Sequence, residues 1–204
     1  MVYKVTEIFR SIQGEGYHVG RVAIFIRLSG CNLNCSWCDT SYLKFSEYHT
    51  VEIVDEVLEL IEGDDPLIVI TGGEPTIQPL NPLCEELTLL GKATIAIETN
   101  TTNMKILSRL KACGLVDWIT GSPKKQPELE YGEESVFSEL DEIKIIYPTG
   151  LQPLEFEPFI PHLIKNRRAY IQPCSQNFEA AVEFVKQNPQ WRLSIQIQKI
   201  LGVR

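Results

Sequence analysis

The sequence predicts an α/β fold in which crossover helices connect a parallel sheet, with the sheet either open or closed into a barrel. Two observations lead to this prediction. Short runs rich in β-branched and aromatic residues recur along the chain, and after the first run their starts are roughly 25 residues apart, enough for a strand, a loop and a helix. Segments with apolar residues at helical spacing lie between these runs. Strands that alternate with helices form parallel sheets.

The expected elements follow one another in a regular order. The strands are expected at Val22–Leu28, Leu67–Ile70, Ala93–Ile97, Val116–Ile119, Glu142–Ile146, Ala169–Ile171 and Arg192–Ile197. The helices are expected at 50–62, 79–91, 103–114 and 177–187. Gly91 and Gly114 stand where glycine commonly ends a helix. The polar stretch 122–134 is expected to be a surface loop.

Length and composition indicate one globular domain, residues 1–204. Hydrophobic residues make up 44% and charged residues 23% of the chain, which argues against wholesale disorder. The formal net charge of −8 argues against a broad surface for nucleic acid or an anionic membrane. The N-terminus has no apolar signal-peptide core, and no apolar run reaches the length of a membrane span. We therefore expect a cytoplasmic protein with neither nucleic acid nor membrane as a partner.

Six cysteines are the unusual feature of the composition. Cys31, Cys35 and Cys38 lie on the long segment between the first two predicted strands, and the other three are scattered. We expect residues 29–49 to form an extended loop, and such a loop inside a compact domain is usually functional. In a reducing compartment, a cysteine cluster indicates metal or redox chemistry. Cys84 and Cys113 are expected to be packing residues.

The spacing C-x3-C-x2-C allows three thiolates of one short loop to reach one metal centre and leaves a coordination position open. Thiolates select zinc or iron–sulfur clusters. A structural zinc site needs a fourth ligand, and His49 is the histidine that could supply it. From the spacing alone, an iron–sulfur cluster, a zinc site and plain thiols all remain open.

The cysteine motif, with Trp37 directly before the last cysteine, resembles that of the radical S-adenosylmethionine enzymes. A second match is Thr71-Gly72-Gly73-Glu74-Pro75, directly after a predicted strand. The resemblance implies a partial, open TIM-like βα barrel with a compact radical S-adenosylmethionine core. It also implies one four-iron four-sulfur cluster on the three cysteines, with S-adenosylmethionine chelating the fourth iron. Gly72, Gly73 and Glu74 would bind the methionine amino group of that cofactor.

Polar residues also gather at the carboxyl ends of the later predicted strands, where parallel barrels bind their ligands. They are Glu98, Asn100, Ser122, Lys124 and Gln172, with Lys144 inside the fifth strand and Gln196 in the last. By resemblance, the cofactor would be contacted by Trp37, Cys38, Asp39, Glu98, Ser122, Pro123, Lys124, Gln172, Pro173, Cys174 and Ser175.

The N-terminal segment carries a second set of polar groups. Gln13 and Glu15 flank Gly14, and Arg27 stands just before the cysteine loop. An amide, a carboxylate and a guanidinium suit a heterocycle that carries a carboxylate. On spacing alone, a glycine-rich hairpin with solvated polar residues is the favoured alternative.

The segments SIQGEG, RLSGCNL and TGGEP, in this order, resemble the 7-carboxy-7-deazaguanine synthase family. The resemblance implies a carbon–nitrogen lyase that converts 6-carboxy-5,6,7,8-tetrahydropterin into 7-carboxy-7-deazaguanine with loss of ammonia. The substrate would be contacted by Ile12, Gln13, Gly14, Glu15, Arg27 and Thr71. Thr40 would bind Mg²⁺, and the catalytic roles would belong to Cys31, Cys35, Cys38, Arg27 and Thr40. Asp39-Thr40-Ser41 would also serve as a plain turn.

The resemblance further implies a homodimer and a reduced flavodoxin or ferredoxin as electron donor. Such donors are acidic, so a local basic patch is expected; its candidates are Lys44, Lys165, Arg167 and Arg168. The sequence departs from the family at Thr101, where many members have glycine, and at Gln198, where the family usually has histidine. The family can also use its C-terminal carboxylate near the substrate, and the chain ends at Arg204, close to the last strand.

Two other functions share parts of these motifs. An enzyme that installs a glycyl radical on a partner protein would share the cysteine loop and the GGEP segment, but it has no evident need for Gln13, Glu15 and Arg27. A non-catalytic zinc-binding module would use the cysteines for structure alone. Turnover of a pterin without a protein substrate, and the metal content after anaerobic reconstitution, separate the three.

Overall fold

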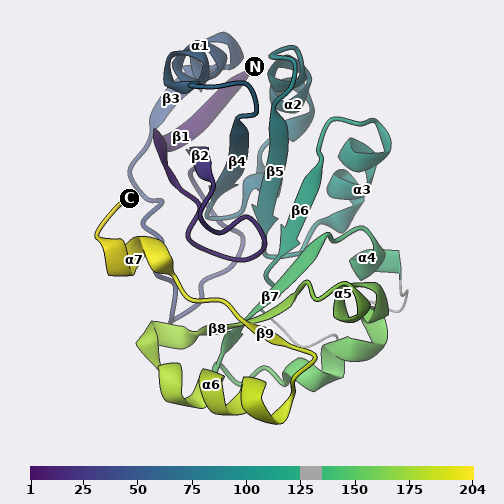
Figure 1. The fold of residues 1–204 in the computed structure, drawn as a ribbon. Coiled ribbons are helices and arrows are strands. Elements are labelled where there is room, and N and C mark those ends of the chain that lie inside the picture. Colours follow the sequence, from purple (N-terminus) through teal and green to yellow (C-terminus); the bar gives the residue numbers. More distant parts are fainter. Residues whose placement is uncertain (125–134) are drawn as a thin grey trace.

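The computed structural model describes residues 1–124 and 135–204, and its central feature is one curved sheet of nine strands (Figure 1). Its strand order is β3-β1-β2-β4-β5-β6-β7-β8-β9. The strands are β1 (Val2–Ile12), β2 (Val22–Leu28), β3 (Ser46–His49), β4 (Leu67–Gly72), β5 (Thr94–Thr99), β6 (Trp118–Gly121), β7 (Glu142–Tyr147), β8 (Ala169–Pro173) and β9 (Arg192–Leu193).

The helices lie mainly along the outside of this sheet (Figure 1). They are α1 (Thr50–Leu60), α2 (Leu80–Thr88), α3 (Met104–Ala112), α4 (Ser135–Ser138), α5 (Pro161–Lys165), α6 (Phe178–Gln187) and α7 (Ile197–Leu201). Short 3₁₀ helices are η1 (Pro75–Ile77), η3 (Pro153–Phe159) and η4 (Cys174–Gln176). A helix able to cross a membrane is not found among the described residues.

The predicted parallel α/β sheet is confirmed. From β2 onward each strand pairs in parallel with the next one in the sheet, as far as β9. The two ends of the sheet, β3 and β9, do not pair with each other, so the barrel is open, as expected from the resemblance. The four predicted helices all form, with bounds that shift by at most three residues.

One strand was not expected from the sequence, and the bounds of two expected segments were wrong. Residues 2–12 form the long strand β1, which pairs antiparallel with both β2 and β3. The predicted loop 29–49 is shorter than expected, because its last four residues form strand β3 (Ser46–His49). The segment without regular structure therefore ends at residue 45. The last strand is only Arg192–Leu193, and Gln196 stands at the start of α7 instead of inside a strand. Residues 125–134 of the predicted surface loop lie outside the described residues.

Alternate residues of β2, β4, β5 and β6 belong to two separate apolar clusters. Ile26, Ile70 and Leu107 belong to the large core between the sheet and the helices. Phe25 and Val69 belong to a smaller cluster on the opposite, inner face of the sheet. Because strands buried on both faces need apolar residues at almost every position, β2 and β4 read as continuous hydrophobic runs.

The loop between β1 and β2 bridges the open side of the barrel. The Gly16 N–H donates to Ser194 Oγ at 3.1 Å, and the Ile197 N–H donates to the Gly14 carbonyl at 3.1 Å. A Cβ at Gly14 would lie 2.7 Å from the backbone nitrogen of Gln198, so only glycine permits this approach. The start of the chain is thereby joined to its end next to the strand termini.

Candidate active site

A cavity of about 650 Å³ opens at the carboxyl ends of the parallel strands. Side chains two positions apart in a strand lie on the same face. On the inner face, the last apolar side chain of a strand is therefore followed by a polar one: Arg27 follows Phe25, Thr71 follows Val69, and Glu98 follows Ala96. Apolar side chains therefore fill the lower part of the barrel, and polar side chains line the open end. This change within single strands forms a polar site on an apolar base.

Most predicted site residues line this one cavity. They are Ile12, Gln13, Gly14, Glu15, Arg27, Cys31, Cys35, Trp37, Cys38, Asp39, Thr40, Thr71, Gly72, Gly73, Glu98, Ser122, Lys124, Gln172, Pro173, Cys174 and Ser175. Glu74 and Pro123 do not line it. The sequence had indicated Asn100, Lys144, Gln196 and Gln198 without a firm role, and these residues line it too.

The three clustered cysteines are free thiols on the loop that borders the cavity. Burial raises the pKa of the Cys35 thiol, Lys124 opposes this increase, and Cys38 and Cys31 add to it. Among the described residues, no three His, Cys, Asp or Glu side chains are gathered to hold a single ion. A cluster attaches each thiolate to a different iron, so its ligands need not meet at one point. Three free thiols around one cavity fit such a group.

The GGEP segment holds the cysteine loop by close backbone contact. The Glu74 N–H donates to the Gly30 carbonyl at 2.9 Å, and a Cβ on Gly73 would lie 2.0 Å from that oxygen. Asn100 Nδ2 lies 3.9 Å from Cys31 Sγ and donates to Asn32 Oδ1 at 2.9 Å. The ends of β4 and β5 therefore position the first part of the loop.

Glu74 is fully buried and joins the ends of the same two strands. Its carboxylate accepts hydrogen bonds from Thr76 Oγ1 at 2.6 Å, from Thr99 Oγ1 at 2.8 Å and from the Asn100 N–H at 2.6 Å. A buried carboxylate whose hydrogen-bond donors all come from the protein stabilises the fold and has little capacity left for a ligand. In this structure Glu74 acts on the cavity through Asn100.

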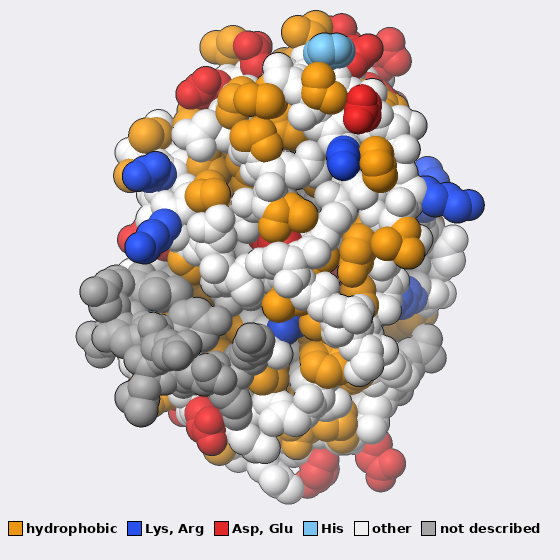
Figure 2. All heavy atoms as spheres, turned by 180° about the vertical axis from the view of Figure 1, so that it is seen from behind, with side chains coloured by type: hydrophobic (Ala, Val, Ile, Leu, Met, Phe, Trp, Pro, Cys, Tyr) orange, Lys and Arg blue, Asp and Glu red, His pale blue; other side chains and the backbone are white. Residues whose placement is uncertain are grey.

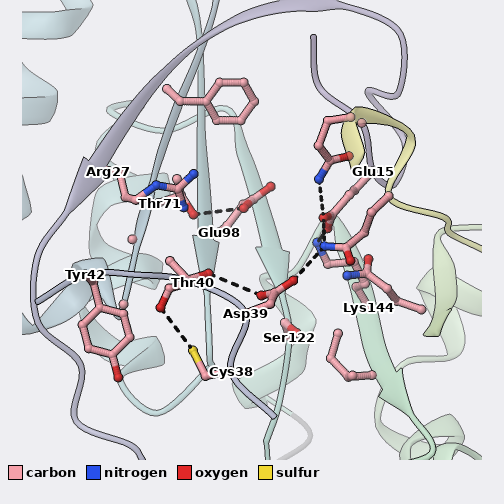
Figure 3. A pocket seen from close by; sticks show the side chains of 18 of the residues that line it. Glu15, Arg27, Cys38, Asp39, Thr40, Tyr42, Thr71, Glu98, Ser122 and Lys144 are labelled. Atoms are coloured by element: carbon pink, nitrogen blue, oxygen red, sulfur yellow. Dashed lines mark hydrogen bonds and ion pairs between the residues drawn. The ribbon is translucent and has the colours of Figure 1, made fainter. Parts of the chain in front are cut away.

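The opposite wall carries the amide, carboxylate and guanidinium groups expected from the sequence (Figure 3). Glu98 accepts from Gln13 Nε2 at 3.1 Å and from Thr71 Oγ1 at 3.0 Å. Arg27 pairs with Thr71 in register and donates from Nε to Glu7 at 2.8 Å. Its guanidinium lies 5.7 Å from the centre of the Phe9 ring. Arg27 therefore already holds a carboxylate beside the cavity.

Glu15 and Lys144 form a buried ion pair at one side of the cavity (Figure 3). Their side chains are 12% and 7% exposed. The other Glu15 oxygen accepts from Gln196 Nε2 at 2.8 Å and from Gln198 Nε2 at 3.0 Å. Burial raises the pKa of Glu15, but Lys144 and the two amides outweigh it and lower the pKa. Lys144 was a charged residue inside an apolar run, and that position was the signal in the sequence.

The segment that follows β9 closes the cavity against the cysteine loop. Lys199 Nζ donates to Asp39 at 2.5 Å, and Gln196 Nε2 donates to the same carboxylate oxygen at 3.1 Å. Burial raises the pKa of Asp39, and these partners reverse that effect and lower it. Arg204 pairs with Glu7 at 3.0 Å. The sequence did not predict these contacts, because they join residues from opposite ends of the chain.

Two further groups lie on the rim of β6 and β8. Lys124 Nζ donates to Ser122 Oγ at 2.7 Å, and burial together with the charge of Lys144 lowers the pKa of Lys124. Gln172 is 4% exposed, and its Oε1 has no hydrogen-bond partner among the described residues. A buried acceptor without a donor, on the wall of a cavity, is a group that a bound ligand can satisfy.

Comparison with known proteins identifies the family. The model for the radical SAM superfamily matches residues 25–125. A 7-carboxy-7-deazaguanine synthase of Bacteroides thetaiotaomicron is 37% identical over 206 aligned residues, which cover 100% of both chains. The chain belongs to the 7-carboxy-7-deazaguanine synthase family. The synthase of Haemophilus influenzae is 32% identical, with 98% of this chain and 94% of that protein covered.

A solved structure agrees with this assignment to the 7-carboxy-7-deazaguanine synthase family. The crystal structure of QueE from Escherichia coli matches with a TM-score of 0.67 and 28% identity, and the match covers 96% of this chain and 94% of that one. The chain is therefore a radical S-adenosylmethionine enzyme, and enzymes of this superfamily use a four-iron four-sulfur cluster and S-adenosylmethionine. This family membership favours a cluster over zinc on Cys31, Cys35 and Cys38.

Proposed function

We propose that this enzyme converts 6-carboxy-5,6,7,8-tetrahydropterin into 7-carboxy-7-deazaguanine with release of ammonia, in the cytoplasm and on one domain that spans residues 1–204. One observation carries the proposal: a single cavity has three free thiols on one wall and the amide, carboxylate and guanidinium groups on the other. When bound, the cluster and S-adenosylmethionine supply a radical that removes a hydrogen atom from the substrate. The protein supplies binding, orientation and exclusion of water.

The substrate wall is assigned to Ile12, Gln13, Gly14, Glu15, Arg27 and Thr71. Arg27 binds the substrate carboxylate, because a guanidinium matches a carboxylate with two parallel hydrogen bonds. Its contact with Glu7 is made through Nε, so this contact does not use the two terminal nitrogens, which can pair with the substrate carboxylate. Carboxylates of this wall accept hydrogen bonds from the N–H groups of the pterin ring.

The cofactor wall is assigned to the cysteine loop and the rims of β4, β6 and β8. Gly72 and Gly73 let the backbone approach the methionine part, and Gln172 offers its unpartnered oxygen to an N–H or O–H donor. The other cofactor contacts of the proposal are Trp37, Cys38, Asp39, Glu74, Glu98, Ser122, Pro123, Lys124, Pro173, Cys174 and Ser175. Of these, Glu74 acts from behind the cavity wall.

Thr40 is proposed as a protein ligand of Mg²⁺. Its Oγ1 lies on the cavity wall, 3.5 Å from Asp39 Oδ1, so oxygen donors are present, and Mg²⁺ prefers oxygen ligands. The proposal predicts that Thr40→Val raises the Mg²⁺ concentration needed for half-maximal turnover and that Thr40→Ser does not. If both variants reached half-maximal turnover at the same Mg²⁺ concentration, Thr40 would not be a ligand of the metal.

A reduced flavodoxin or ferredoxin is proposed as the electron donor, and a homodimer as the working form. Of the basic candidates, Lys44 is exposed on the cysteine loop. Lys165, Arg167 and Arg168 lie before β8, at the end of the strand away from the cavity, and Arg168 is engaged 4.8 Å above Trp118. Figure 2 shows that Lys and Arg side chains lie apart on the rear face. Lys44 is therefore the candidate that the proposal keeps.

The test is anaerobic reconstitution followed by incubation with the tetrahydropterin, S-adenosylmethionine, Mg²⁺ and a chemical reductant. A brown protein containing iron and sulfide that forms the deazapurine and ammonia without any protein substrate is the expected result. A colourless protein that holds only zinc would overturn the cluster assignment. If the cofactor were cleaved and the pterin stayed unchanged, the assignment of the pterin as substrate would be wrong. An enzyme that activates a partner protein would then be favoured.

A further inference from the structure

Lys144 is the buried lysine in direct contact with Glu15 on the cavity wall, and the proposed function gives it no task. It stands in the middle of β7, on the inner face of the sheet, and its ammonium group contacts the carboxylate of Glu15 from the loop after β1. The two residues are 129 positions apart in the chain. A buried charge needs a partner, and this pair satisfies that need for both groups.

The surroundings of Glu15 are rich in negative charge. The carboxylates of Glu98 in β5 and Glu142 in β7 interact electrostatically with the ammonium group of Lys144. Glu142 and Glu15 also interact electrostatically with each other. The nearby cation is Lys124, which is hydrogen-bonded to Ser122. The other groups that contact Glu15 are the neutral amides Gln196 and Gln198. Lys144 is therefore the one described cation in direct contact with this set of carboxyl groups.

Glu142 shows how burial affects the pKa of a carboxyl group in this part of the protein when no lysine contacts it. It is 3% exposed, accepts from the Tyr17 N–H at 2.7 Å and has no ion pair among those found in the described residues. Burial raises the pKa of Glu142 to about 7. Glu15 is also largely buried, yet its pKa is lowered, first because Lys144 contacts it and then because Gln196 and Gln198 donate hydrogen bonds to it. Removing Lys144 would move Glu15 toward the behaviour of Glu142.

We propose that Lys144 is a positioning residue that keeps Glu15 ionised, so that the substrate wall presents a charged acceptor to the N–H donors of the pterin ring. The inference rests on the proposed function and deepens it, because it states which charge the substrate wall needs. If Glu15 were protonated, its O–H group would face an N–H donor of the ring. Two donors cannot form a hydrogen bond with each other, so one hydrogen bond to the substrate would be lost. Lys144 therefore acts through Glu15 and not on the substrate itself.

The experiment measures the pterin dissociation constant of the reconstituted enzyme from pH 6 to 9, for wild type, Lys144→Met and Lys111→Met. Lys111 pairs with Asp141 at 2.6 Å away from the cavity, so its variant controls for loss of a lysine–carboxylate pair. The wild type and Lys111→Met should share one pH profile. Lys144→Met should bind more weakly at pH 6 and recover about tenfold in affinity for each pH unit until Glu15 ionises.

A double-variant comparison keeps the test decisive if Lys144→Met folds poorly. Glu15→Gln and Glu15→Gln/Lys144→Met both lack the carboxylate, and the second also lacks the unpaired lysine. Equal pterin dissociation constants in these two variants support action through Glu15. A further loss in the double variant, or a Lys144→Met profile that follows the wild type, overturns the inference. Absence of pterin binding by the wild type overturns the proposed function instead.

Discussion

The two walls of the cavity are built in different ways. The cysteine wall is one short loop whose Cys38 side is exposed, and it is held from behind by backbone contacts from Gly73 and Glu74. The opposite wall is made of charged side chains from distant parts of the chain, and the pair of Glu15 and Lys144 is nearly fully buried. The cysteine wall has room to receive a large group. The charged groups of the opposite wall are already held by ion pairs or hydrogen bonds, as a site that recognises a small molecule requires.

This difference predicts that the two walls fail separately. A change in the cysteine wall should stop all radical chemistry and leave the fold intact. A change in the charged wall should leave cofactor cleavage and reduce binding of the substrate.

Cys35→Ala should abolish turnover, because a cluster that needs three thiolate ligands would lose one of them. Iron and sulfide content after reconstitution, together with cleavage of S-adenosylmethionine, measures the loss. Cys113→Ala is the control, since Cys113 is an exposed free thiol outside the cavity. A Cys35→Ala enzyme with full iron content and turnover would remove Cys35 from the ligand set.

Arg27→Ala should weaken pterin binding by about 100-fold, because a charge-assisted contact with the substrate carboxylate is lost. Equilibrium binding of the tetrahydropterin under anaerobic conditions measures this change. Arg10→Ala is a matched control, as Arg10 of β1 pairs with Glu62 at 2.9 Å and does not line the cavity. If both variants bound the pterin as the wild type does, Arg27 would have no part in recognition.

Glu142, which lies beside Lys144 behind the charged wall, makes the stability of the protein depend on pH. Burial raises its pKa from 4.5 to about 7 in the folded protein, so the folded state holds this proton more tightly than the unfolded state. Its contribution is fully present below pH 4.5 and is lost as the pH rises to about 7, a change of about 3 kcal/mol.

Glu142→Gln should remove this dependence. Urea unfolding of the wild type between pH 4.5 and 7 should show a free energy of unfolding that falls with pH, and the variant should show a flatter curve. Equal slopes for the two proteins would mean that Glu142 titrates normally.

Lys199→Gln should have the smallest effect. Its ion pair with Asp39 joins the end of the chain to the cysteine loop, but the two side chains are 43% and 52% exposed. Exposed pairs contribute less than about 1 kcal/mol and are screened by salt. Urea unfolding at low and high salt should detect a small loss that disappears at high salt. A loss of several kcal/mol would show that this contact holds the cysteine loop in place.

The cysteine wall could be predicted from the sequence, because its residues follow one another at fixed spacing. The polar residues at the carboxyl ends of β4, β5, β6 and β8 could be predicted too, because the strands recur at regular spacing along the chain. The end of the last strand could not, since β9 stops at Leu193. Lys144 was visible as a charge within an apolar run, but its partner was not, because no local pattern relates β7 to the loop after β1. The contacts of Gln196 and Gln198 with Glu15 depend on a turn into α7 where a strand was expected.

The role of Glu74 illustrates a further limit of the sequence. The motif TGGEP predicted a carboxylate that faces the cofactor, and the structure directs this carboxylate into hydrogen bonds between β4 and β5. Short motifs identify the residues of a site, while the direction of each side chain depends on the neighbouring strands. Asn100 was visible in the sequence as a polar residue at a strand end, but nothing there indicated that it and Thr99 donate hydrogen bonds to Glu74.

The most direct test of separate walls measures two products in one reaction: 5′-deoxyadenosine from cofactor cleavage and the deazapurine from the pterin. Cys35→Ala should form neither product. Arg27→Ala should still cleave the cofactor, so that its ratio of 5′-deoxyadenosine to deazapurine exceeds that of the wild type by more than about tenfold. An Arg27→Ala enzyme in which both products fall together, at an unchanged ratio, would contradict the separation of the two walls.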